Sequence, residues 1–493
     1  MSKLEISKQT YKRLKNNQSH RGVTLVLILV FGFIFLLLIE TLTNLSITRV
    51  KLVKQKLSWE KSLVIAEAGI DYYRWHLAHY PNDYQDGTDQ PGPYLHEYKD
   101  TSGQTVGYFS LEITPPSGCS PAVEIQSTGW TTDFPNIKRS VKIKYAQPAL
   151  AKYAFLINTN AWFGDTESLK GPFHSNGGIR MDGWQNSLST SAKQTYICGS
   201  EHGCTSSNCS DPCQWTASGC QCPGIWGAGS GGPSGLWEYP VPAVDFNKIT
   251  QDLAQLKTRA QESGIYLGNL GLGYHLKFKS DGTFDVYRVK KLKPKVHYCD
   301  LDNNCGWSSI DIQTEEFYAN YPVPSNCSPI FIEDNVWVDG IINGRATVVA
   351  AKLPDTPNTE KNIYIPHSIL KYNNQSVLGL IAQKNIQITL YSDDDLIIEA
   401  AMLAQKGHIC RWYYPHISWL QPYKDYAIRN SITTFGSTIS YGEWTYSYVN
   451  WSNQIVSGYQ NTNSNYDASL TFDPPPYFPV DGDFQTIQWV EEK

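Results

Sequence analysis

The chain contains a long uncharged apolar run near its N-terminus, from Gly22 to Ile39. At a rise of ~1.5 Å per residue, a helix over these 18 residues nearly crosses a hydrocarbon core ~30 Å thick. The weakly polar residues that follow, as far as Ile47, complete the crossing. The pattern therefore predicts a transmembrane helix over residues 23–47.

The same helix is expected to continue beyond the membrane over residues 48–80. Between Val50 and Leu77 there is no proline and a single glycine, Gly69, and apolar residues recur at helical spacing on one face. Charged residues occupy the other face, and Pro81 ends the pattern. The sequence thus predicts one helix with an apolar half and an amphipathic half.

Residues 81–150 are predicted to form a small β-sheet. Three segments rich in β-forming residues, 106–113, 122–128 and 140–145, are separated by turn residues. Short antiparallel strands after a long helix predict an α+β unit in which the helix packs on the sheet.

Residues 151–470 are predicted to be a large β-rich region. Short runs of Val, Ile and Leu alternate with Gly and Asn, as in 336–345 and 378–388. This texture indicates the stacked coils of a right-handed β-solenoid, in which each coil buries its apolar residues against the next. Asn is expected at the turns because it tolerates positive φ. A β-sandwich is the alternative fold for this region, so the chain as a whole is predicted to be α+β and mostly β.

Two further segments have their own patterns. Residues 244–263 have the spacing of an amphipathic helix laid on the solenoid. Residues 471–493 form a proline-rich C-terminal tail, with three consecutive prolines at 474–476. Because proline has no backbone N–H to donate, this tail is expected to run extended along the surface.

The eleven cysteines indicate an oxidising compartment. Six of them crowd into a Gly-rich insertion over residues 198–235, and two more bracket a short loop. A zinc site is the competing interpretation, but none of the six is spaced as C-x-x-C. Disulfides are therefore predicted without a pairing, and the odd total leaves at least one thiol unpaired or bridged to another chain. The disulfide candidates are Cys198, Cys204, Cys209, Cys213, Cys220, Cys222, Cys299 and Cys305.

One loop has a weak calcium-binding pattern. Acidic or amide oxygens stand at the first, third, fifth and twelfth places of the segment that begins at residue 300. The sixth place is Cys305 rather than Gly, so a disulfide-closed turn is the alternative. The calcium candidates are Asp300, Asp302, Asn304 and Asp311, and no other cofactor is predicted.

Catalytic patterns are weak throughout the sequence. There is no phosphate-binding loop, zinc-protease motif, nucleophile elbow or dinucleotide fingerprint. His174 and Ser175 are sequence neighbours, which says little about catalytic geometry, and the acidic run 393–395 is typical of a solvated turn. The net charge is −5, and the sequence has no domain-wide cluster of basic residues of the kind that binds nucleic acid. We therefore expect neither an enzyme nor a nucleic-acid-binding protein.

The N-terminus resembles that of type IV prepilins. Six basic residues precede Gly22, and Val23, Thr24 and Leu25 follow it, as in the prepilin signature. No small-residue cleavage site of a secretory signal peptide follows Ile39. The resemblance implies that residues 1–22 are a cytoplasmic leader and that a prepilin peptidase cuts between Gly22 and Val23.

Two further positions refine the resemblance. Most pilins carry Glu at the fifth mature position, whereas this chain has Leu27 there. Some minor pilins and the K-type pseudopilin also lack this Glu, and the resemblance places such subunits at the filament tip. Within the second half of the helix, Ala66, Glu67, Ala68 and Gly69 resemble a segment of PilX-type minor pilins, in which small residues let the helix lie close to the sheet. Similar β-rich regions also follow PilX-type N-termini.

The resemblance implies a minor, tip-located subunit of a type IV pilus or a related filament. Such a subunit is a single-pass inner-membrane protein that presents its C-terminal region outside the cell and joins other pilins through its helix. The distal region would contact a surface, a host cell or a polymer. A K-like pseudopilin of a type II secretion or DNA-uptake system, and a membrane-anchored enzyme acting on polysaccharide, are the alternatives.

Overall fold

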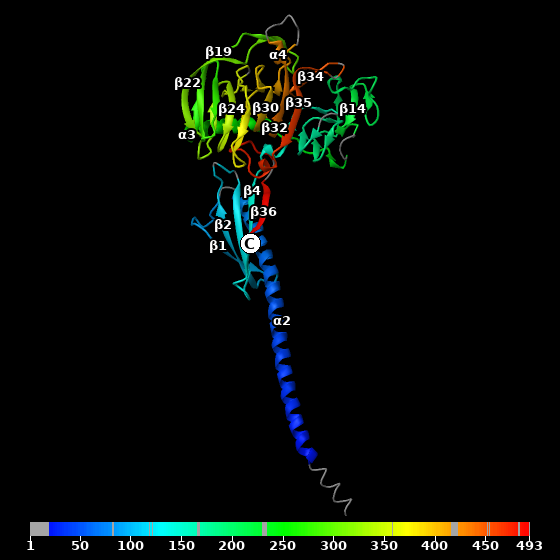
Figure 1. The fold of residues 1–493 in the computed structure, drawn as a ribbon, viewed down its shortest axis with the longest axis vertical. Helices are drawn as coiled ribbons and strands as arrows, with labels where there is room; N and C mark the ends of the chain where they lie inside the picture. The colour runs from blue at the N-terminus through cyan, green and yellow to red at the C-terminus, as the bar shows by residue number, and fades with distance from the viewer. Residues whose placement is uncertain are drawn as a thin grey trace, which may run out of the picture. The chain divides into compact units, whose positions relative to one another are not determined.

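The fold is described from a computed structural model of the chain. It describes residues 19–80, 83–117, 119–120, 122–164, 168–228, 234–356, 358–415, 423–450, 452, 454–481 and 484–492, so most of the predicted leader lies outside the described residues. The chain divides into two compact units (Figure 1). Unit 1 comprises residues 1–113, 125–143 and 489–493, and unit 2 comprises residues 114–124 and 144–488.

Unit 1 is a long helix packed on a five-stranded sheet. Helix α2 runs over Ser19–His79, and the strands lie in the order β1-β2-β3-β4-β36. Their bounds are β1 Tyr94–Lys99, β2 Thr105–Thr114, β3 Val123–Thr131, β4 Lys138–Ala146 and β36 Gln485–Glu492. The helix buries Ile65, Ala66, Ile70, Tyr73 and Leu77. The predicted helix and sheet are therefore present, but the sheet also takes a strand from the C-terminus.

Unit 2 is built from parallel β-ladders that run from coil to coil, as a solenoid requires and a β-sandwich does not. The longest ladder has ten strands. In stacking order they are β17 Ile265–Leu267, β23 Ile330–Ile332, β25 Arg345–Ala350, β28 Val377–Ala382, β30 Asp395–Ala404, β32 Ile428–Ser440, β5 Phe155–Ile157, β8 Phe173–Ser175, β11 Ser189–Ser191 and β16 Trp237–Glu238.

Two further sets of ladders complete the coils. One joins β18 Tyr274–Phe278, β24 Val336–Ile342, β26 Ile363–Ile365, β29 Ile386–Ile388, β31 Ile409–Arg411 and β33 Trp444–Thr445. The other joins the second half of β24 through β27 Ile369–Lys371 to the first halves of β30 and β32, and then to β35 Ile455–Tyr466. The coils at the other end add β6 Ala161–Phe163, β7 Ser168–Leu169, β9 Ile179–Met181, β10 Trp184–Gln185 and β15 Ile225–Trp226.

Antiparallel strand pairs are added to this stack of parallel ladders. They are β18 with β19 Thr283–Leu292 and β22 Ile312–Pro322, β20 Val296–Cys299 with β21 Cys305–Ser308, and β34 Ser447–Val449 with β35. The Cys-rich insertion forms β12 Thr195–Cys198, β13 Gln214–Thr216 and β14 Gly219–Pro223. A short helix, α4 Lys424–Ala427, precedes β32.

The stacking order of the coils differs from their order in the chain. Strand β32, late in the sequence, pairs in parallel with β5, the first strand of the region, through Thr438 and Phe155. The two ends of the long ladder are β16 and β17, which are neighbours in the sequence. The chain therefore enters and leaves the stack at its middle.

Helix α3, Lys248–Ser263, links the two ends of the ladder and covers its outer face. Alternate residues of the ladder point inward, and the outward ones form an apolar stripe that packs against the helix. The stripe includes Phe331, Val349, Ile381 and Leu403, and the helix contributes Ile249, Leu253, Leu256 and Ala260. Because both faces of the ladder are covered, the whole of β28 is buried and its sequence reads as a continuous apolar run. The predicted amphipathic helix thus lies on the solenoid, but it begins at Lys248 and not at residue 244.

The proline-rich part of the C-terminal tail does not run extended along the surface, so that prediction from the sequence was wrong. Pro474, Pro475 and Pro476 are buried against unit 2, where Thr347 donates a hydrogen bond to the carbonyl of Pro476. The prolines need no ladder partner, because the carbonyl of Pro474 accepts from the Arg345 side chain and that of Pro475 accepts from the backbone N–H of Phe478. The later part of the predicted tail forms β36, which the sequence did not indicate as a strand.

Candidate functional site

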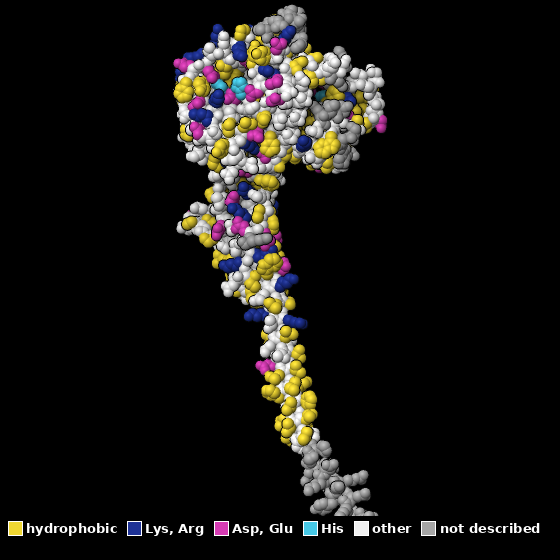
Figure 2. Space-filling model, in the orientation of Figure 1, with side chains coloured by type: hydrophobic (Ala, Val, Ile, Leu, Met, Phe, Trp, Pro, Cys, Tyr) yellow, Lys and Arg dark blue, Asp and Glu magenta, His cyan; other side chains and the backbone are white. Residues whose placement is uncertain are grey.

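The membrane-facing half of α2 is the first candidate site. Side chains from Gly22 to Lys54 are exposed, and the hydrophobic ones form a continuous apolar surface along the helix (Figure 2). By length and composition the helix can cross a membrane. Such a large apolar surface is unfavourable in water, so it requires lipid or other apolar helices around it.

The polar side chains of this half are compatible with an apolar environment. The hydroxyls of Thr41 and Thr43 donate hydrogen bonds to carbonyls one turn earlier in the helix, Leu37 and Ile39 among them. These groups therefore need no water to satisfy them. The first acidic residue after Gly22 is Glu40, near the far end of the apolar run.

The prepilin-like residues lie at the beginning of the helix. A Cβ added to Gly22 would meet no atom within 4 Å, and Val23 is exposed. Packing in the chain therefore does not require a glycine at position 22. Leu27, where most pilins carry Glu, is also exposed. Cleavage between Gly22 and Val23 stays a prediction.

The small residues of the second half of α2 bring the helix into close contact with the sheet. Ala66 is fully buried, and a Cβ on Gly69 would come within 2.3 Å of the Ser127 hydroxyl. From the sheet side, a Cβ on Gly129 would lie 2.4 Å from the backbone of Ser62 and of Ala66. Larger side chains at these positions would separate the helix from β3.

Comparison with solved structures finds a distant likeness. The crystal structure of the competence-associated pilin ComZ from Thermus thermophilus is similar to this chain. Sequence identity is 12%, the TM-score is 0.29, and the match covers 88% of this chain and 97% of that one. No family model matches, and no curated protein matches. A likeness this distant does not place the chain in a family, so its function has to be inferred from its own residues.

All eight predicted disulfide cysteines are paired in the structure. The bonds are Cys198–Cys204, Cys209–Cys220, Cys213–Cys222 and Cys299–Cys305, with a fifth between Cys119 and Cys327. Cys410 is the unpaired thiol and is buried. Two trios of sulfur atoms in the insertion lie within 4.8 Å of one another, but every member belongs to a disulfide and is not a thiolate ligand. The fifth bond has no local spacing signal because its partners are 208 residues apart.

The calcium candidates do not converge. Asp300 caps its own turn by accepting the backbone N–H of Asn304 at 2.7 Å, and Asp302 lies 3.3 Å from a ring nitrogen of His408. Asp311 is buried elsewhere and accepts the N–H of Tyr391 at 3.0 Å. Among the described residues, these four do not form a group whose oxygens could share one ion. The Cys299–Cys305 bond closes the loop instead.

His174 and Ser175 are structural members of a ladder. The two ring nitrogens of His174 bond Thr190 at 2.8 Å and Asn176 at 3.0 Å, while the Ser175 hydroxyl donates to the carbonyl of Thr159 at 2.6 Å. Burial lowers the pKa of His174, which keeps the ring neutral. The two side chains are engaged separately and make no base–nucleophile pair.

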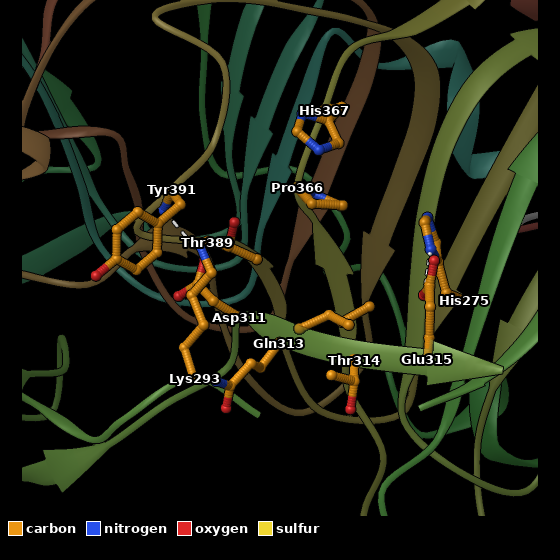
Figure 3. Close-up of a pocket in the computed structure, with 11 residues that line it drawn as sticks. His275, Lys293, Asp311, Gln313, Thr314, Glu315, Pro366, His367, Thr389 and Tyr391 are labelled. Atoms are coloured by element: carbon orange, nitrogen blue, oxygen red, sulfur yellow. Dashed lines mark hydrogen bonds and ion pairs between the residues drawn. The ribbon is translucent and has the colours of Figure 1, made fainter. Parts of the chain in front are cut away.

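A pocket of about 300 Å³ on the flank of the solenoid was not predicted from the sequence (Figure 3). Its lining comes from β18, β22 and the turns that follow β26 and β29, so its members lie far apart in the chain. No local motif links them, which is why sequence reasoning missed them. The lining residues are His275, Lys293, Asp311, Ile312, Gln313, Thr314, Glu315, Pro366, His367, Thr389 and Tyr391.

His275 is the best-organised polar group of this pocket. Its Nδ1 lies 2.9 Å from Glu315 of β22, and its Nε2 lies 2.9 Å from Asp339 of β24. Burial alone would lower the pKa of His275, but the hydrogen bonds to Asp339 and Glu315 outweigh burial and raise it to about 9. The imidazolium therefore joins the hairpin to the solenoid and is charged at neutral pH.

Proposed function

We propose that this chain is a minor subunit of a type IV pilus or a type IV-like filament, located at the filament tip. The observation that carries the proposal is helix α2. Its second half is anchored in a small sheet by close packing, and its first half is an uncovered apolar rod long enough to cross a membrane. A helix of this kind can move from lipid into a bundle of similar helices without exposing its apolar surface to water.

The tip location is supported by Leu27. A subunit within a filament has a neighbour above it whose N-terminal amine needs an acidic partner, whereas a tip subunit has none. Leu27 offers no carboxylate at this position, and the first acid, Glu40, lies 13 residues further along. The Ala66–Gly69 segment and the large distal unit support a PilX-like identity within this class.

We further propose that the role is structural or adhesive and not catalytic. In the flank pocket, both ring nitrogens of His275 are engaged by carboxylates, Nδ1 by Glu315 and Nε2 by Asp339, so neither is free to exchange a proton with a substrate. Unit 2 would then be displayed outside the cell, stabilised by its disulfides, and the helix would be inserted in the inner membrane until assembly. A K-like pseudopilin of a secretion or DNA-uptake system shares the same anchor and the same lack of an acidic residue at position 27.

Mass spectrometry of the natural product tests this proposal. We expect a mature N-terminus at Val23 and copurification with sheared filaments, with immunogold label confined to filament ends. Label along the whole filament would contradict the tip location. An intact Met1, or a start after residue 39, would contradict membership of the class. Recovery with secretion-system components alone would favour the pseudopilin.

A further inference from the structure

The flank pocket is lined by both basic and acidic side chains. The cationic groups are His275 and Lys293, and the carboxylates are Asp311 and Glu315. Lys293 extends its ammonium over the ring of Tyr391, 3.6 Å from the ring centre, and donates its backbone N–H to the carbonyl of Asp311 at 2.8 Å. Groups of both signs therefore line the pocket, and burial raises the pKa of the Asp311 carboxyl, so no strong single-sign charge favours an ionic ligand.

The pocket instead offers directional hydrogen-bonding groups. Gln313 and Thr314 of β22 supply an amide and a hydroxyl, which can each donate and accept. Asp311 is buried and held by the backbone of Tyr391, so its orientation is fixed before any ligand arrives. Glu315 is likewise held by His275. Pre-positioned carboxylates of this kind can accept two neighbouring hydroxyls of one molecule.

Flat apolar surfaces complete the lining. Figure 3 shows the Tyr391 ring and Asp311 on one side of the pocket, with His275 and Glu315 facing them from the other and His367 near Pro366. The apolar side chains of Ile312 and Pro366, next to fixed acceptors, suit a molecule with C–H groups on one face and hydroxyls around its edge. The volume lies at the low end for ligand cavities, which suits one ring and not an extended chain.

We propose that this pocket binds a single neutral sugar unit, with Glu315 and Asp311 accepting its hydroxyls and the apolar side chains of Ile312 and Pro366 contacting its C–H groups. The proposal rests on the proposed function, because it names the ligand class of the displayed unit. Binding can nevertheless be measured on the isolated chain, so it can fail while filament membership holds, and the reverse.

The test uses the full chain in a zwitterionic detergent, because glycosidic detergents would compete for the pocket. Saturation-transfer NMR is recorded with galactose, glucose and N-acetylglucosamine at millimolar concentration, and with galacturonate and glucosamine as charged comparators. We expect transfer to at least one neutral sugar. No transfer to any of the three, or stronger binding of a charged comparator, would overturn the proposal.

Two neighbouring residues of β22 provide the site-specific test. Glu315 lines the pocket, whereas Glu316 pairs with Lys290 at 2.8 Å on the exposed surface and does not line it. We expect E315Q to weaken sugar binding by about tenfold or more, because a charge-assisted hydrogen bond is lost, and E316Q to leave it unchanged. Equal effects of E315Q and E316Q would place the sugar elsewhere. If E315Q alters the circular dichroism spectrum, Q313A replaces it, and a smaller but measurable loss is expected because a neutral hydrogen-bonding group of the lining is removed.

Discussion

Arg139 of β4 donates a hydrogen bond from its Nε to the carboxylate of Glu491 in β36, at 2.7 Å. The same guanidinium lies 3.6 Å from the ring centre of Trp59 in α2, and its side chain is 8% exposed. One arginine therefore joins the helix, the sheet and the last strand of the chain. The contact links residues 352 positions apart in the sequence.

Glu491→Gln is expected to loosen β36. The substitution removes the charge that neutralises a largely buried guanidinium, and we expect a loss of about 1–2 kcal/mol in the stability of unit 1, measured by urea unfolding. Glu492→Gln is the control, because Glu492 contacts Gln126 on the exposed face. It should cost less than about 0.5 kcal/mol. Equal losses for the two variants would show that Arg139 does not depend on Glu491.

Gly129→Ala is expected to destabilise the contact between α2 and the sheet. A Cβ at this position meets the helix backbone at Ser62 and Ala66, which cannot move aside without shifting the helix. Overpacking of this kind costs about 1–3 kcal/mol, read as a lower melting temperature of unit 1. Gly32→Ala, where a Cβ meets nothing within 4 Å, should leave the melting temperature unchanged.

Gly22→Leu is expected to block removal of the leader without disturbing the folded chain. Space around Gly22 is open, so any effect arises from the peptidase and not from packing. Intact-mass measurement of the membrane fraction should show the leader retained in G22L and removed in G32L. A mature N-terminus at Val23 in G22L would contradict the assigned cleavage site.

His275 should make the stability of unit 2 depend on pH above neutrality. The pKa is raised from 6.5 to about 9, so the stabilisation is complete below about pH 6.5 and is lost as the pH rises through about 9. A shift of this size corresponds to stabilisation on the order of 3 kcal/mol. Urea unfolding followed by circular dichroism should show this decline in the native chain.

His275→Gln should flatten that part of the pH profile, since no titrating ring remains. His367→Gln serves as the control, because the His367 ring is exposed and pairs with Asp393, outside the triad. The decline should persist in H367Q. A flat profile in the native chain would show that the triad of His275, Glu315 and Asp339 does not stabilise the protonated ring.

The Cys119–Cys327 bond should stabilise unit 2 more than any local disulfide. It closes a loop of 208 residues, whereas Cys299–Cys305 spans 6. In the chain-entropy model the longer loop contributes about 5 kcal/mol and the shorter about 2 kcal/mol. Paired Cys→Ser variants of each bond, compared by urea unfolding, test this order. A larger loss for C299S/C305S would contradict it.

Local periodicity in the sequence was enough to predict the elements of the fold. The helix, the small sheet, the stacked parallel strands and the helix on the solenoid each have a pattern of apolar residues that burial requires. Strand β36 was missed because its neighbours in the sheet lie at the other end of the chain. The coil order was likewise not predictable, since the pairing of β32 with β5 depends on two segments with no shared local signal.

The expectation that asparagine serves the turns through positive φ holds for Asn303 and Asn358 but not for the asparagines that join successive coils. Asn335, Asn362 and Asn385 do not adopt positive φ. The side chains of Asn335 and Asn362 each accept the backbone N–H of the next asparagine, at 3.0 and 3.1 Å. The side chain of Asn385 accepts that of His408 at 2.8 Å. The turns are thus held by a ladder of amides between coils, which single-sequence reasoning cannot see because the partners lie 23–27 residues apart.

The pocket was beyond the reach of the sequence for the same reason. His275, Asp311 and His367 belong to separate coils and hairpins, and no motif links them to one another. The calcium pattern around Asp300 shows the opposite case, in which a local spacing exists but the fold sends Asp311 to a different place. Site chemistry in a solenoid depends on which coils are stacked, and that is decided by the core.

Helix α3 connects the two outermost strands of the stack, so neither end of the stack carries a chain terminus. In an open solenoid the outermost coil carries a chain terminus, so it can fray, and evolution can add or delete a repeat there. Here both outermost strands, β16 and β17, are tied together by α3, and the chain's entry and exit are internal. Adding one coil would demand a longer α3, so the number of coils and the length of that helix must change together.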